Sequence, residues 1–377
     1  MDSYQRHQRI WKLLAFLMKC WIPRKFNLRF QPLQQEGPIL LIANHTCAWD
    51  PILVATGMGR RQIYFVASEH LFRMGLVSRL INWLVAPIPR RKATLGTDTV
   101  KACLRHLRAG HSVCIFAEGE QCWDGRSQPV FPATGKLAKL AGVTLVTYRL
   151  EGGYLSLPRW GRRVRRGAVY AHPVKVYSPE LLKTMSPEEI NEAVDRDLYE
   201  NAWERQKAAP VAYRGRRRAE GLERALYLCP GCQQIGSLRS KGDRLFCACG
   251  LDLCFTETGL FSPPQPFSTI ADWEDWQRQA LHSRVFPPGA LLFSDSDMQL
   301  SLVLPDHEEC RLGSGLALEQ YEDRLVCGEQ VFPLTEINSM AAVLSSLLLL
   351  SFRGNYYQIR AEKDTNLRKY LEIWRKR

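Results

Sequence analysis

Short apolar runs alternate with amphipathic stretches between about residues 38 and 176 of the chain. Apolar runs rich in Val, Ile and Leu are typical of buried strands, whereas apolar positions three and four residues apart are typical of helices. The alternation predicts an α/β domain with a mixed, mostly parallel sheet flanked by helices. The expected strands are 39–43, 63–67, 113–117, 144–148 and 168–176. The expected helices are 51–58, 76–85, 97–108, 134–141 and, after a capping box that begins at Ser186, one that ends near residue 207.

The pattern changes after this domain. Strand-like runs separated by Gly and Asp begin near Val285, and they predict a mostly-β module. Leu367, Tyr370, Leu371 and Trp374 have the spacing i, i+3, i+4 and i+7, which predicts a terminal amphipathic helix. We therefore divide the chain into an N-terminal amphipathic helix (1–24), the α/β domain (25–207), a basic linker (208–224), a Cys-bearing segment (225–262) and a C-terminal α+β module (263–377).

Charge and cysteine content narrow the class of partner. The chain has 51 Lys and Arg against 38 Asp and Glu, a formal net charge of +13. This balance favours an anionic partner, which is a phospholipid surface, a phosphorylated substrate or nucleic acid. The 12 cysteines include two closely spaced pairs, which in a reducing compartment favour metal binding over disulfides. We therefore expect a protein that lies in the cytosol or faces it.

The N-terminal stretch 10–23 is apolar, but Lys12 and Lys19 interrupt it, so it is too short to span a bilayer unaided. No small-residue cleavage site follows it, which argues against a secretory signal. The lysines and Arg9 lie near one helical stripe, and apolar side chains cover much of the rest. This pattern predicts a helix in the interface of an anionic membrane, peripheral or monotopic, at the cytoplasmic face of the cell membrane. Packing on the domain's own core is the alternative.

Candidate chemistry lies in the turn between the expected strand 39–43 and the helix that follows it. Active sites of open α/β sheets gather at such turns. His45 can take a hydroxyl proton near neutral pH, and the carboxylate of Asp50 can fix its tautomer. Two alternatives stay open here. Asp50 could simply cap the helix, and Cys47 could be the nucleophile of a Cys–His pair, although cysteine is commonly a small apolar filler.

The sequence Asn44-His45, four further residues and Asp50 resembles the first motif of the glycerolipid acyltransferase family, whose members acylate glycerol-3-phosphate, lysophosphatidic acid and related lysolipids. Further segments resemble the later blocks of the family, in the same order. These segments are 88–91, 116–119 and 135–143, and the resemblance covers about residues 5–205.

The resemblance implies a direct acyl transfer, in which His45 and Asp50 are catalytic. His45 would deprotonate the free hydroxyl of a lysophospholipid, which attacks the thioester of acyl-CoA or acyl carrier protein. The expected acceptor is 1-acylglycerol-3-phosphate, in phospholipid biosynthesis. The later blocks imply substrate-binding residues, with Arg91 a better match than Arg90 in the second block. These residues are Arg90, Arg91, Glu118, Gly119 and Lys136.

The third block departs from the family pattern. It usually continues Glu-Gly-Thr-Arg, but Glu120 and Gln121 occupy the last two positions, and Thr147 replaces the usual proline of the fourth block. A phosphate-binding arginine is therefore missing and an acid has appeared, which would cost affinity for a phosphate. Arg126, Lys136 or the arginines of 159–166 could supply the lost positive charge. The acceptor headgroup is thus the open part of the prediction.

The Cys-bearing segment resembles a zinc ribbon. Cys229 and Cys232 are followed, after 14 residues, by Cys247 and Cys249, and four thiolates suit one tetrahedral Zn²⁺. The second pair is one residue tighter than usual, so Cys254 is an alternative to Cys249. Such a site usually staples a segment that is too small to build a core. We expect structural zinc rather than a nucleic-acid partner, and no cofactor is needed for catalysis.

The C-terminal module loosely resembles a pleckstrin-homology-type domain, because its strands and tight turns precede one closing helix. Such modules bind ligands and are not enzymes. The alternative to an acyltransferase is therefore a zinc-binding scaffold, or a lipid- or nucleic-acid-binding protein with a degenerate acyltransferase domain.

Overall fold

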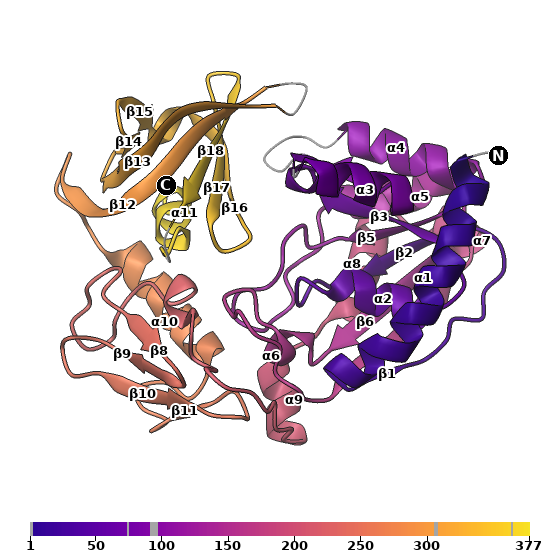
Figure 1. Ribbon diagram of the computed structural model, residues 1–377, viewed down its shortest axis with the longest axis horizontal. Coiled ribbons are helices and arrows are strands. Elements are labelled where there is room, and N and C mark those ends of the chain that lie inside the picture. Colours follow the sequence, from indigo (N-terminus) through magenta and orange to yellow (C-terminus); the bar gives the residue numbers. More distant parts are fainter. Residues whose placement is uncertain (1–2, 74, 91–96, 305–307, 363–364) are drawn as a thin grey trace. The chain divides into compact units, whose positions relative to one another are not determined.

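The computed structural model describes residues 3–73, 75–90, 97–304, 308–362 and 365–377. Within these residues the chain divides into two compact units (Figure 1). The first unit contains the chain up to residue 159 together with 164–215, and the second contains 160–163 and 216–377.

The first unit is built on one seven-stranded sheet with the order β1-β7-β6-β2-β5-β3-β4. Neighbouring strands are parallel except β6 and β7. The predicted mixed, mostly parallel sheet is therefore confirmed. The strands are β1 (Leu28–Phe30), β2 (Ile39–Ala43), β3 (Ile63–Ser68), β4 (Ile88–Arg90), β5 (Ser112–Phe116), β6 (Thr144–Glu151) and β7 (Val169–Tyr177).

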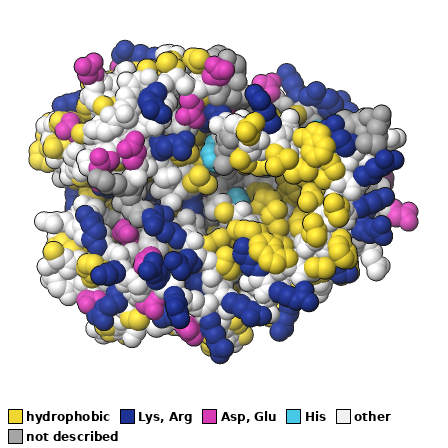
Figure 2. Space-filling model, viewed as in Figure 1, with side chains coloured by type: hydrophobic (Ala, Val, Ile, Leu, Met, Phe, Trp, Pro, Cys, Tyr) yellow, Lys and Arg dark blue, Asp and Glu magenta, His cyan; other side chains and the backbone are white. Residues whose placement is uncertain are grey.

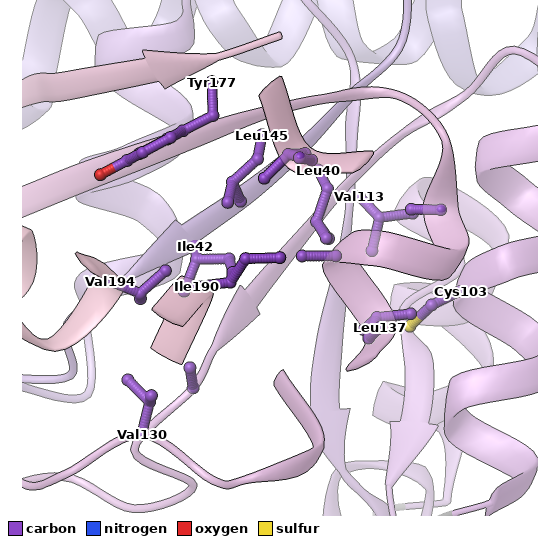
Figure 3. Close-up of a cluster of buried hydrophobic side chains, with 14 of the residues drawn as sticks. Leu40, Ile42, Cys103, Val113, Val130, Leu137, Leu145, Tyr177, Ile190 and Val194 are labelled. Carbon is purple, nitrogen blue, oxygen red and sulfur yellow. The ribbon is translucent and has the colours of Figure 1, made fainter. Parts of the chain in front are cut away.

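Helices cover both faces of this sheet (Figure 1). Leu40 and Ile42 of β2 join a cluster with α4, α5 and α8 (Figure 3), whereas Ile39, Leu41 and Ala43 join a second cluster with α1 and α2. Burial on both faces explains why β2 is apolar at every position. The helices are α1 (Ser3–Phe26), α2 (Asp50–Met58), α3 (Leu76–Val85), α4 (Thr97–Arg108), α5 (Ala133–Ala141), α6 (Gly153–Ser156), α7 (Pro179–Thr184), α8 (Pro187–Leu198) and α9 (Ala202–Ala208), with a 3₁₀ turn at Glu69–Arg73.

The single helix expected after Ser186 is wrong, because the structure has two helices, α8 and α9. Ser186 forms the predicted capping box at the start of α8. The chain then leaves the helix at Tyr199, and Asn201 caps α9 by accepting from the N–H groups of Trp203 and Glu204. An asparagine that satisfies two N–H groups at once makes a new helix start favourable at this point.

The second unit contains two sheets. The Cys-bearing segment forms a four-stranded antiparallel sheet, and α10 (Ile270–Ser283) follows it. The C-terminal module is a seven-stranded antiparallel sheet of order β15-β14-β13-β12-β18-β17-β16, closed by α11 (Arg368–Arg375), as predicted. The strands are β8 (Arg239–Lys241), β9 (Arg244–Phe246), β10 (Asp252–Phe255), β11 (Phe261–Ser262), β12 (Leu291–Val303), β13 (Glu309–Tyr321), β14 (Arg324–Cys327), β15 (Gln330–Pro333), β16 (Ile337–Val343), β17 (Leu347–Phe352) and β18 (Asn355–Ala361), with 3₁₀ turns at Leu222–Arg224 and Leu334–Glu336.

A buried ion pair joins α10 to α11 inside this unit. Arg368 Nη1 donates to Glu274 Oε2 at 2.8 Å, and both side chains are nearly inaccessible to water. Trp273 Nε1 donates to Leu228 O at 2.9 Å, next to the first cysteine pair. These contacts tie the Cys-bearing segment and α11 to the same helix, α10. The ion pair resists separation, because breaking it would leave an uncompensated charge buried.

The segment 208–224, expected to be a linker, carries buried side chains of its own. Tyr213 is buried and donates through its hydroxyl to Ala168 O at 2.9 Å. Ala219 and Leu222 are also buried. The division between the two units falls inside this segment, after residue 215.

Candidate active site

Two turns meet at the carboxyl edge of neighbouring parallel strands. β2 ends at Ala43 and β5 at Phe116, and these two residues are paired in register. His45 N donates to Glu118 Oε1 at 2.9 Å, and Cys122 N donates to His45 O at 3.1 Å. The loop after β5 therefore holds both backbone polar groups of His45. The first block, with His45, and the third block, with Glu118, are thus side by side although these residues are 73 positions apart. They lie at the edge where α/β sheets bind ligands.

The strand on the other side of β2 is locked to the same turn. Asn44 Nδ2 donates to Leu150 O at 2.8 Å, and Leu150 N donates to Asn44 Oδ1 at 2.7 Å. Asn44 is fully buried. A side-chain amide thus extends the pairing of β2 and β6 by one residue and fixes the start of the His45 turn.

The His45 imidazole is oriented by a carboxylate. Its Nδ1 lies 2.8 Å from Asp50 Oδ2, and its ring stacks on Phe116 with centroids 4.4 Å apart. Because a carboxylate can only accept, Nδ1 carries the hydrogen and Nε2 keeps a lone pair. The His45 side chain is 17% exposed and the Asp50 side chain 0%. The pair therefore combines a partly accessible imidazole with a carboxylate that water does not reach.

Asp50 is held by the turn and not by the helix it begins. Its Oδ2 accepts from the N–H groups of Thr46 and Cys47 at 2.5 and 2.8 Å, and its Oδ1 accepts from the Thr46 hydroxyl at 2.9 Å. Trp49, and not Asp50, occupies the N-cap position of α2. The alternative that Asp50 is only a helix cap is therefore wrong, because its carboxylate points back to the His45 turn.

Cys47 is fully buried beside the same carboxylate. Its thiol donates to Asp50 Oδ1 at 3.1 Å. Burial and the Asp50 charge raise the pKa of the Cys47 thiol well above its usual value. A cysteine nucleophile needs a depressed pKa, so this environment favours the filler role over an acyl-enzyme.

Glu118 has both carboxyl oxygens engaged. Oε1 accepts from His45 N, and Oε2 accepts from Gln128 N at 2.8 Å. Burial raises the pKa of Glu118 to about 8, and the two backbone N–H donors oppose part of that rise. Glu118 thus braces the loop that carries His45, while its predicted contact with the acceptor stays a prediction.

Phe131 links the second block to the third. The guanidinium carbon of Arg90 lies 4.6 Å from the Phe131 ring centroid, and burial lowers the pKa of Arg90. A Cβ on Gly119 would fall 2.0 Å from Phe131 Cε2, so the ring fills the space that this glycine leaves. Arg91, the better motif match, lies outside the described residues. Lys136 is exposed in the first turn of α5, and its role stays a prediction.

Arg159 supplies positive charge beside the altered third block. Its Nη1 donates to Glu120 Oε2 at 2.8 Å and to Gln121 O at 3.0 Å. Its guanidinium carbon lies 3.9 Å from the Trp123 ring centroid. A second candidate, Arg126, is paired with a neighbouring aspartate. No local pattern marks the Arg159 contact, because 39 residues separate Arg159 from Glu120.

The four predicted metal ligands lie together in the second unit. The Sγ atoms of Cys229, Cys232, Cys247 and Cys249 are all within 4.8 Å of one another. Cys229 and Cys249 are 3.6 Å apart, and Cys232 and Cys247 are 3.7 Å apart. Four thiolates bound tetrahedrally to Zn²⁺ at about 2.3 Å would be about 3.8 Å apart. The spacing therefore suits a metal, and Cys249 rather than Cys254 completes the cluster.

Fold and site together define the class of protein: an α/β domain with a carboxylate-oriented histidine at the carboxyl edge of its sheet. Residues 25–151 match the family model described as Acyltransferase. The chain is 26% identical over 161 residues to a chloroplastic 1-acyl-sn-glycerol-3-phosphate acyltransferase of Brassica napus, and 24% identical over 160 residues to one of Arabidopsis thaliana. Each match covers 40% of this chain, and the chain spans only 44% and 43% of those two relatives.

Residues 25–151 therefore form a domain of the family described as Acyltransferase. Among solved structures, the chain is similar to the 1-acyl-sn-glycerophosphate acyltransferase of Thermotoga maritima, with 18% sequence identity and a TM-score of 0.43. That match covers 52% of this chain and 79% of the other.

Proposed function

We propose that this protein transfers a fatty acyl group from acyl-CoA or acyl carrier protein to the free hydroxyl of a lysophospholipid, in phospholipid biosynthesis. The observation that carries the proposal is the 2.8 Å contact between His45 and Asp50 at the edge of an acyltransferase-family domain. The acceptor in the names of the plant relatives, 1-acyl-sn-glycerol-3-phosphate, is the reference acceptor.

In the proposed reaction, His45 Nε2 takes the proton of the acceptor hydroxyl as its oxygen attacks the thioester carbonyl. The carbon–sulfur bond then breaks, and the imidazolium returns the proton to the departing thiolate. Asp50 stabilises the imidazolium, because its buried negative charge lies 2.8 Å from Nδ1. The protein forms no covalent bond to the acyl group, in keeping with the protonated Cys47.

Exposed apolar side chains support membrane association as part of this proposal. Trp11, Ala15 and Phe26 of α1 are buried against the domain, while the opposite face of α1 stays exposed. Hydrophobic side chains gather over the part of the first unit where α1 and α3 lie (Figure 2). The large exposed apolar residues of these helices are Leu13, Phe16, Leu17, Trp21, Leu76, Val77, Leu80 and Trp83.

Apolar surface of this extent suits the interface of a bilayer. Among the described residues, none of the helices has the length and apolarity needed to cross a membrane. The proposed location is peripheral or monotopic, at the cytoplasmic face of the cell membrane, with the anionic surface attracted by the net charge of +13.

The Cys229, Cys232, Cys247 and Cys249 cluster is proposed to hold one structural Zn²⁺. A second candidate function, a zinc-binding scaffold, rests on this cluster alone.

One experiment distinguishes the acyltransferase from the zinc-binding scaffold. Purified protein in detergent is incubated with a panel of lysolipids and acyl thioesters, and mass spectrometry identifies the products. Acylated lysolipid that forms with wild type and not with His45→Ala supports the transferase. No product across the panel would favour the zinc-binding scaffold.

A further inference from the structure

We propose that the Glu120 carboxylate selects the acceptor headgroup, disfavouring a phosphate monoester and favouring a phosphodiester. The inference rests on the proposed acyl transfer, because it concerns the acceptor of that reaction. The preferred acceptor class is then a lysophospholipid whose phosphate carries a single negative charge.

Glu120 lies in a loop that is tied to His45 on both sides. Glu118, two residues before it, accepts from His45 N at 2.9 Å, and Cys122, two residues after it, donates to His45 O at 3.1 Å. Two Cα–Cα steps span at most about 7.6 Å, so the Cα of Glu120 is within that distance of both anchoring residues. Glu120 therefore lies in the loop that borders the His45 turn. Charges closer than the Debye length, about 8 Å at physiological ionic strength, are only partly screened, so we infer that the Glu120 charge acts on the headgroup of an acceptor whose hydroxyl reaches His45.

Arg159 holds this carboxylate in place without covering it. Arg159 Nη1 lies 2.8 Å from Glu120 Oε2, and the Arg159 side chain is only 3% exposed whereas that of Glu120 is 26% exposed. The Trp123 ring packs on the guanidinium at 3.9 Å. The cation is thus enclosed by protein while the anion keeps an edge toward solvent. A ligand approaching from solvent meets the carboxylate before it meets the arginine.

A phosphate monoester and a phosphodiester differ in charge, so the Glu120 carboxylate repels them to different extents. A phosphate monoester carries about −1.5 to −2 near pH 7, because its second pKa is near 6, whereas a diester carries one negative charge. Repulsion between like charges about one Debye length apart is worth roughly fivefold to tenfold in the relative rate at low salt. Arg90, a half-buried cation in the second block that lies over the Phe131 ring, is suited to a single phosphate charge.

The test compares two acceptors with the same acyl chain, 1-acylglycerol-3-phosphate and the matching lysophosphatidylglycerol, in mixed micelles with the full chain. The measured quantity is the ratio of kcat/KM for the diester to that for the monoester. We expect a wild-type ratio above about five, and Glu120→Gln should lower it about fivefold, because glutamine keeps the shape and removes the charge. Glu120→Asp, which keeps the charge, and Glu188→Gln, on the exposed face of α8, should leave the ratio within about twofold.

A salt series repeats the test without any variant. Raising the salt from 0.1 to 1 M shortens the Debye length from about 10 to about 3 Å, so the wild-type ratio should fall. Turnover with a ratio that neither Glu120→Gln nor salt changes overturns the inference and leaves the acyl transfer standing. Turnover of neither acceptor, together with no product across the full panel of lysolipids and acyl thioesters, overturns the acyl transfer, and the inference with it.

Discussion

At the residue scale, the site depends on a glycine, Gly119, whose missing side chain leaves room for the Phe131 ring. Gly119 has a positive φ of +76° and lies under the Phe131 ring that also contacts Arg90. Its place in the third block was predictable from the motif, but the reason for it was not, because Phe131 is twelve residues away and belongs to none of the blocks. The contact of Arg159 with Glu120 likewise leaves no pattern in the motifs, because Arg159 lies outside all of the blocks.

Gly119→Ala should destabilise the protein by about 1–3 kcal/mol, because the new Cβ is strained at this φ and collides with Phe131. Urea unfolding measures the loss. Gly110→Ala is the matched control, since Gly110 has a φ of +80° and open space around its Cβ. A loss no larger than that of Gly110→Ala would show that Phe131 simply moves aside.

Glu118 should make stability depend on pH. Burial raises the pKa of its carboxyl from 4.5 to about 8, so folding takes up a proton between these values. The Glu118 contribution to stability is full below about pH 4.5 and is lost as pH rises toward about 8. From pH 5 to 8, the free energy of unfolding of wild type minus that of Glu118→Gln should fall by more than about 1.4 kcal/mol, the equivalent of one pKa unit. A flat difference would contradict the raised pKa.

At the element scale, sequence periodicity found the sheet and most of its helices, since β2, α3 and α4 have the predicted bounds. Fully apolar short runs and amphipathic helices leave strong patterns. The break between α8 and α9 escaped prediction because no Gly or Pro marks it: the chain leaves the helix at Tyr199, and Asn201 caps the next helix. Short β4 also left no pattern, since it has only three residues.

The exposed faces of α1 and α3 yield a prediction at this scale. The double substitution Phe16→Asp and Leu80→Asp should lower partitioning onto anionic phospholipid vesicles more than about tenfold, because burying one large apolar side chain is worth about 1.5–3 kcal/mol. Sedimentation with vesicles measures the bound fraction. Leu140→Asp is the control, as Leu140 is equally exposed but lies on α5. Equal vesicle binding by wild type, the double variant and Leu140→Asp would show that the exposed faces of α1 and α3 do not bind the membrane.

At the scale of the whole molecule, the second unit is held by links between its parts. Tyr227 N donates to Gln277 Oε1 at 3.0 Å, and Glu274 on the same helix binds Arg368 of α11. The cysteine spacing made the metal cluster predictable, whereas these links join residues 50 and 94 positions apart and leave no local pattern.

Removing metal from the cysteine cluster should therefore loosen more than the segment that binds it. After chelation, or in Cys249→Ser, hydrogen–deuterium exchange should rise in α10 and α11 as well as in residues 225–262. Peptides from β2 and β5 in the first unit serve as the internal reference. Faster exchange confined to 225–262 would mean that the cluster and the C-terminal module are independent.

The central claim is that His45, oriented by Asp50, is the base of a direct acyl transfer. The most direct measurement follows a labelled acyl group from its thioester to a lysophospholipid, with wild type, His45→Ala and Cys47→Ala of verified fold. His45→Ala should lose about 10²–10⁴-fold in kcat. Cys47→Ala should stay within about threefold of wild type, since its thiol is buried and protonated. Transfer that survives His45→Ala, or labelled protein that depends on Cys47, would contradict the account.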